Sequence, residues 1–88
     1  HAPQTGSMLW AVNLVAYSSQ PPARDAMAEL KTEGVKAEVV QVKTGGRTYY
    51  RVRIPDLSSR QEAMRVHAAF KNRHGYDAPW ISSYRKSL

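Results

Sequence analysis

The 88-residue chain has no cysteine, few acidic residues and no long apolar run. Without cysteine it forms neither disulfides nor thiolate zinc sites, although this does not fix the cellular compartment. No segment approaches the ~20 apolar residues that span a bilayer, and no charged-then-apolar leader opens the chain. We therefore expect no direct membrane insertion by this segment. An anchor upstream in a longer parent protein stays open.

Acidic charge is scarce relative to basic charge. Thirteen Lys and Arg against seven Asp and Glu give a formal charge of +6 and a pI near 10.0. Such a balance attracts nucleic acid, acidic lipid or acidic polysaccharide, although solubility alone explains part of it. Residues 43–53 hold four basic side chains and no acid, so much of the charge falls in one segment.

That basic segment alternates apolar and polar side chains with the period of two that is typical of a β-strand. An aromatic ring beside two guanidinium groups is costly to bury and unusual on a merely solvated surface. We interpret this face as a binding platform, and an ordinary strand with a solvated basic face is the alternative. Tyr50, Val52 and Ile54 are expected to face the core, and Tyr49, Arg51 and Arg53 the opposite side.

The length fits one domain with one modest core. Residues 1–7 lack an apolar pattern and are assigned to a linker or an expression remnant, which leaves residues 8–88 as the domain. Strands are predicted near residues 8–17, 36–43, 48–54 and 79–84, and helices near 22–33 and 59–74.

The predicted boundaries rest on turn and capping residues. Pro22 suits a first helical turn and Gly34 a helix end. The Gly45-Gly46 pair predicts a hairpin turn, and Pro55 is expected to end the strand that follows it. The second helix is expected to start with a capping box formed by Ser59 and Glu62 and to end at Gly75.

The element order βαββαβ predicts an α+β fold in which a four-stranded antiparallel sheet carries both helices on one face. The other face is left open, and the first strand is expected to direct Ala11, Asn13 and Val15 toward it. The predicted interior residues are Trp10, Val12, Leu14, Leu30, Val52, Ile54, Val66 and Phe70. Asn13 would offer amide donors and an acceptor to a ligand, or be a simple outward polar residue.

No arrangement of residues indicates catalysis. His67 and His74 are interpreted as a structural histidine and a surface cation rather than as metal ligands or a base. Asp56, Glu62 and Asp77 show no paired-carboxylate pattern, and the serines lie in turns without a nucleophile elbow. We predict a non-enzymatic domain with no catalytic residue, metal or cofactor.

Two segments carry a family resemblance. Residues 10–17, WAVNLVAY, resemble the opening W-x-V-Q-x-G-S-F segment of SPOR domains, the sporulation-related repeat of bacterial cell-envelope proteins. Residues 50–54, YRVRI, followed by SRQEA at 59–63, resemble the second signature of that family, Y-R-V-x-V-G-P with S-x-x-E-A after a short gap. The resemblance covers almost all of residues 8–84. Val15 and Ala16 replace the Gly-Ser pair of the family, which removes a hydroxyl.

The resemblance implies a module that binds peptidoglycan glycan strands lacking stem peptides and targets its parent protein to the division septum. It implies location in the periplasm or cell envelope, possible division proteins as partners through the parent chain, and no nucleic acid. Arg51 and Arg53 would pair with lactyl carboxylates, and aromatic rings would stack on sugars. The implied glycan-binding residues are Asn13, Tyr49, Arg51, Arg53 and Trp80. Core or edge packing is the alternative for the tryptophan.

Two other functions stay open. An RNA-recognition domain shares the topology and strand-three aromatics, but residues 47–54 miss four positions of the RNP1 pattern. A protein-docking domain would use an exposed sheet edge. The sequence does not identify the parent protein, the oligomeric state or the number of sugar units bound.

Overall fold

The computed structural model describes residues 6–71, 76 and 78–87. Its elements are β1 (Gly6–Tyr17), α1 (Gln20–Thr32), β2 (Glu38–Thr44), β3 (Arg47–Leu57), α2 (Arg60–Lys71) and β4 (Trp80–Ser87). The strands form one sheet in the order β2-β3-β1-β4, and every neighbouring pair is antiparallel. The predicted α+β fold is confirmed. The predicted end of α2 near residue 74, with Gly75 as its stop, lies outside the described residues.

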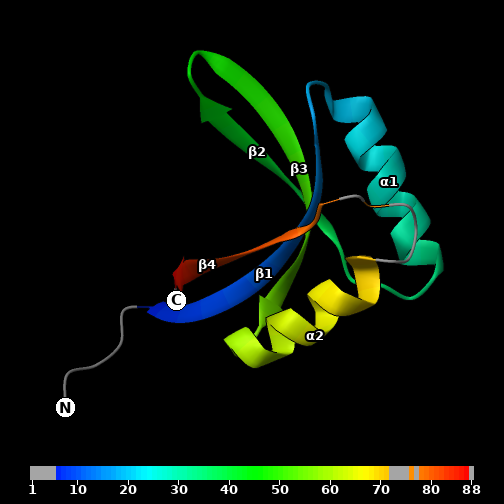
Figure 1. The fold of residues 1–88 in the computed structure, drawn as a ribbon. Coiled ribbons are helices and arrows are strands. Elements are labelled where there is room, and N and C mark those ends of the chain that lie inside the picture. Colours follow the sequence, from blue (N-terminus) through cyan, green and yellow to red (C-terminus); the bar gives the residue numbers. More distant parts are fainter. Residues whose placement is uncertain (1–5, 72–75, 77, 88) are drawn as a thin grey trace.

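Both helices pack on the same face of the twisted sheet, and the other face carries no helix (Figure 1). Helix α1 contacts β1, β2 and β3, and α2 contacts β1, β3 and β4. The core between the helices and the sheet contains Val12, Leu14, Ala23, Leu30, Val52, Ile54, Leu57, Ala63 and Phe70. Trp10 and Val66, which were predicted inside, are partly buried and pack against this cluster.

Glycines form the hairpin turn and the end of α1, as the sequence predicts. Gly45 and Gly46 adopt φ values of 56° and 77°, which suit a two-residue hairpin turn between Thr44 and Arg47. Helix α1 ends in a Schellman motif, in which the amide of Val35 donates to the carbonyl of Leu30 and Gly34 takes φ 81°.

The start of α2 keeps half of the expected capping box. The Ser59 hydroxyl accepts a hydrogen bond from the Glu62 amide at 3.1 Å. The Glu62 carboxylate accepts a bond from the Ser58 hydroxyl at 3.1 Å. Such a cap stabilises a helix by about 1 kcal/mol.

Pro55 does not end β3, contrary to the sequence prediction. The strand continues to Leu57 through a β-bulge, since Val12 pairs with Ile54 but Trp10 pairs with Leu57. A bulge leaves residues out of the ladder, so a proline without an amide donor is tolerated there. Asp56 takes the left-handed conformation at φ 63°.

A second bulge reverses the expected direction of Val15. Asn13 pairs with Arg53 while Val15 pairs with Val52, so Leu14 is the extra residue. The bulge shifts the alternation of β1 by one position. Val15 therefore packs against the core and does not lie on the open face, where it was predicted.

Candidate functional site

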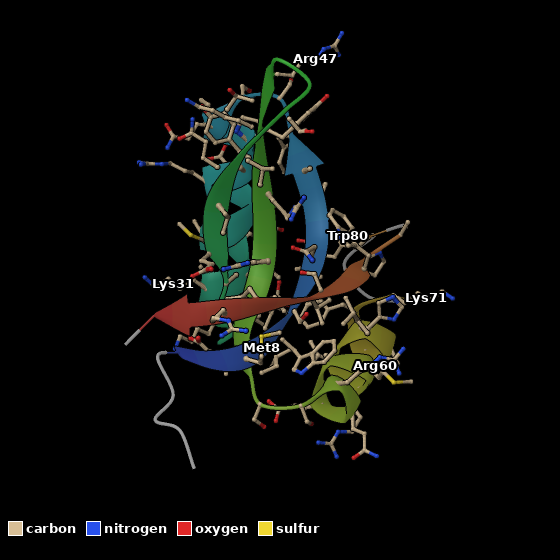
Figure 2. The ribbon with its side chains drawn as sticks, turned by 90° about the vertical axis from the view of Figure 1, so that its left-hand side faces the viewer. Met8, Lys31, Arg47, Arg60, Lys71 and Trp80 are labelled. Atoms are coloured by element: carbon tan, nitrogen blue, oxygen red, sulfur yellow. The ribbon has the colours of Figure 1, made fainter. Side chains whose placement is uncertain are left out.

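The candidate site is the sheet face away from the helices, which Figure 2 views from the front. The middle of β1 supplies only small or medium side chains to this face, namely Ala11, Asn13 and Ala16. The flanking strands supply large ones: arginines from β3 and aromatic residues from β4. Because β1 lies between β3 and β4, its small residues leave room for side chains from either side to meet above it.

The first such contact joins Arg51 of β3 to Trp80 of β4. The guanidinium carbon lies 5.2 Å from the centroid of the indole ring, within cation–π range. Trp80 is 39% exposed, so one part of the ring still faces solvent. Contacts of this kind contribute ~0.5–2 kcal/mol, more as the cation is desolvated. Two of the predicted site residues are therefore direct neighbours in space.

A similar contact joins Arg53 of β3 to Tyr84 of β4. The guanidinium carbon of Arg53 lies 4.3 Å from the centroid of the Tyr84 ring. The Arg53 Nε also donates to Glu38 Oε2 at 2.7 Å, and the Arg53 side chain is only 15% exposed. These two residues face each other in the β2–β3 register. Arg53 is thus held between a carboxylate on one side and an aromatic ring on the other, and Arg51 is the less engaged of the two arginines.

Tyr84 is fixed in turn by the bulge of β3. Its hydroxyl accepts a hydrogen bond from the Asp56 amide at 2.8 Å and donates to Asp56 Oδ1 at 3.1 Å. Lys36 Nζ lies 3.3 Å from the other oxygen of the Asp56 carboxylate. The left-handed residue thereby ties β3 to β4 across β1. Neither Tyr84 nor Glu38 is among the five glycan-binding residues that the family resemblance implies.

Asn13 lies on the predicted side of the sheet but is completely covered. Its Nδ2 donates to the Trp80 carbonyl oxygen at 3.2 Å and to Ser82 Oγ at 2.9 Å. Because a backbone carbonyl can only accept, these bonds fix which end of the amide is nitrogen. In this structure Asn13 positions the start of β4, and with it the tryptophan.

Two buried polar atoms of this site, Asn13 Oδ1 and Arg51 Nε, have no hydrogen-bond partner among the residues that the structure describes. One is an acceptor and the other a donor. A buried polar atom left without a partner costs about 1–3 kcal/mol, and such atoms are rare in native proteins. The cluster therefore has unused capacity for one donor and one acceptor from outside.

Tyr49 lies on the same face of the sheet but apart from Trp80 and Tyr84. It sits two residues beyond Arg51 toward the β2–β3 turn and pairs with Val42. Its side chain is half-buried, as are those of Val40 and Val42 on the same side of β2. The structure thus brings Asn13, Arg51 and Trp80 together, sets Arg53 beside them, and places Tyr49 at the flank.

His67 has a structural role, as expected from the sequence. His67 Nε2 lies 2.7 Å from the Pro79 carbonyl oxygen, so this nitrogen donates and ties α2 to the residue before Trp80.

Within the part of the chain that the structure describes, no group of three His, Asp or Glu could hold a metal. The described helices are also too short or too polar to cross a membrane. His74 and Asp77 lie outside the described residues.

Comparison with protein-family models matches residues 7–82 to the SPOR domain. Searches of curated proteins and of solved structures give no match.

Proposed function

The chain belongs to the SPOR domain family, whose members are peptidoglycan-binding modules of septal proteins, and we propose that its open sheet face binds glycan strands that lack stem peptides. The observation that carries the proposal is the pair of arginine–aromatic contacts, Arg51 with Trp80 and Arg53 with Tyr84. Aromatic rings stack on pyranose faces, and guanidinium groups pair with carboxylates.

The chemistry of a denuded strand fits these groups. Removal of the stem peptide leaves a free lactyl carboxylate on each muramic acid, which gives the strand a regular negative charge. The chain carries a net charge of +6, and Arg51 has no carboxylate partner among the described residues. Arg51 is accordingly proposed as the main carboxylate contact and Trp80 as the sugar-stacking surface. Arg53 lies beside them, already paired with Glu38.

The unpartnered atoms fit a further group of the same polymer. Each sugar carries an acetamide, which has one N–H donor and one C=O acceptor. Asn13 Oδ1 needs a donor, and Arg51 Nε needs an acceptor. Because Asn13 is fully covered, contact with it requires the Arg51 or Trp80 side chain to move aside. Tyr49 at the flank would extend the stacking surface along the strand.

As a non-catalytic module the chain would direct its parent protein to the division septum, in the periplasm or cell envelope. Co-sedimentation with purified sacculi tests this, using sacculi before and after amidase digestion. We expect retention on digested sacculi and much weaker retention on untreated ones, because stem peptides mask the carboxylate and crowd the approach. Equal retention on both would contradict the denuded-glycan proposal.

The ionic contacts should make retention on sacculi depend on salt concentration. Retention should weaken as salt rises, but less steeply than that of a nucleic-acid complex, because only a few carboxylates are engaged. An excess of single-stranded RNA is the matching competitor. If it displaced the chain from digested sacculi, the RNA-binding alternative would regain support.

A further inference from the structure

The edge strand β2 offers a second surface, on the helix side of the sheet. It is the outermost strand next to β3, and its seven residues pair with β3 in an unbroken register. A proline or a bulge in an edge strand hinders the addition of another strand, and β2 contains neither. No strand of the described part of the chain pairs with its outer side, so the backbone groups there are available to an extended chain, which would lie about 4.8 Å away.

A groove of ≈ 480 Å³ runs beside this edge, between β2 and α1. Its apolar lining comes from Met27 of α1, Val39 of β2 and Tyr50 of β3, and its polar lining includes Gln20, Arg24 and Gln41. Both helices lie on one side of the sheet (Figure 1). The groove lies between α1 and the sheet, since its lining comes from α1, β2 and β3. In an added strand every second side chain would point into this groove, because alternate residues face opposite sides of a sheet.

The charge in the groove is complementary to an acidic partner. Arg24 is exposed and forms no ion pair among the described residues, whereas the one acid of the groove, Glu38, is bound by Arg53. Helix α1 has no acidic residue in its first turn, so the positive end of its dipole near Gln20 is not offset. The free charge facing the groove is positive.

We propose that β2 and the adjacent groove form a docking site for an extended peptide that adds to the sheet as a fifth strand. Its groove-facing positions carry an aspartate or glutamate opposite Arg24 and an apolar side chain against Met27 and Tyr50. The backbone bonds to β2 would supply affinity and the groove would supply specificity, as in other cases of strand addition. This surface lies mainly on the other side of the sheet from the proposed glycan-binding face and meets it at the Glu38–Arg53 ion pair, so both ligands can bind together.

The test uses a displayed library of random octapeptides selected on the 88-residue chain, followed by synthesis of the selected peptide. We expect enriched sequences to hold an acidic residue within an alternating apolar pattern. Binding of the synthetic peptide should shift the amide NMR signals of residues 38–44 and of the first half of α1. The variant Arg24→Glu should bind it at least tenfold more weakly and should select basic peptides instead.

Two variants serve as controls. Arg65→Glu makes the same charge change on an exposed position of α2 and should leave peptide binding unchanged. Arg51→Ala should also leave it unchanged, while Arg24→Glu should still sediment with digested sacculi. The proposal is overturned if no sequence is enriched, or if the selected peptide binds Arg24→Glu as well as the parent chain. Self-association through β2, seen as a concentration-dependent dimer in sedimentation, would also overturn it.

Discussion

The guanidinium of Arg51 lies 5.2 Å from the centroid of the Trp80 indole, although the strands that carry them are not neighbours in the sheet. The contact passes over β1, where the side chains are small. The proposed binding face is therefore covered in the free chain by its own cation–aromatic layer. A glycan bound at this face would have to replace contacts of this layer, which makes Arg51 the most informative residue to change.

Arg51→Ala is expected to weaken binding to digested sacculi by about 1.5–3 kcal/mol, or roughly ten- to a hundredfold, because a charge-assisted bond is lost. Folding should be nearly unchanged, since the side chain lies outside the core cluster. Sedimentation isotherms and circular dichroism measure the two effects. Arg65→Ala, on an exposed position of α2, is the matched control and should bind normally.

The outcome that contradicts this prediction is normal binding by a folded Arg51→Ala variant, or loss of binding in Arg65→Ala. In either case the open sheet face would not be the site. Tyr49→Ala should show a loss comparable to that of Arg51→Ala if the flank stacks on a sugar, by about 1–3 kcal/mol.

Asn13→Ala is expected to destabilise the fold by about 1–3 kcal/mol, because it removes two hydrogen bonds to β4 and leaves the Trp80 carbonyl without one of its donors. Urea unfolding measures the change. Ser82→Ala, which removes only the hydroxyl contact, should cost less. Equal stability of Asn13→Ala and the parent chain would show that the amide does not hold β4.

Ala16→Ser tests the departure from the family pattern. Ala16 is exposed and pairs directly with Arg51, so a serine hydroxyl would stand beside the guanidinium. We expect affinity for digested sacculi to rise severalfold, in line with the ~0.5–1.5 kcal/mol of one added hydrogen bond. Ala28→Ser on an exposed position of α1 is the control. Unchanged affinity would mean that the glycan does not reach this position.

Stability should fall at alkaline pH through Tyr76. Burial raises the pKa of Tyr76, and the nearby Tyr17, Glu29 and Glu33 raise it further. The neutral phenol is thus favoured by folding, so its contribution is complete below the ordinary pKa near 10 and is lost as pH rises through the folded pKa. The free energy of unfolding should decline more steeply with pH in the parent chain than in Tyr76→Phe. Identical pH profiles would contradict this.

The hairpin shows how much the sequence alone can predict. The Gly45-Gly46 turn fixes the register of β2 against β3, so Glu38 necessarily faces Arg53. The Glu38–Arg53 ion pair was therefore predictable by counting back from the turn. Short-range rules of this kind also located both ends of α1 and the start of α2 to within two residues, because capping and turn residues act on their own neighbours.

The burial of Asn13 could not be predicted from the residues near it in the sequence. Its burial follows from the register of β4, which pairs with a strand almost seventy residues away in the chain. The two bulges have no comparable sequence signal, and the one at Leu14 reverses the direction of Val15. A pattern of period two predicts which residues alternate, but one extra residue changes which side each of them faces.

The two tryptophans of the chain lie on opposite faces of the sheet, and this makes them separate optical reporters. Trp10 packs against the core on the helix side, while Trp80 is 39% exposed beneath a guanidinium on the other side. A ligand on the open face would shield only the second indole from a soluble quencher such as acrylamide. Quenching of a Trp10→Phe variant would then report occupancy of that face, and quenching of Trp80→Phe would report only the integrity of the core.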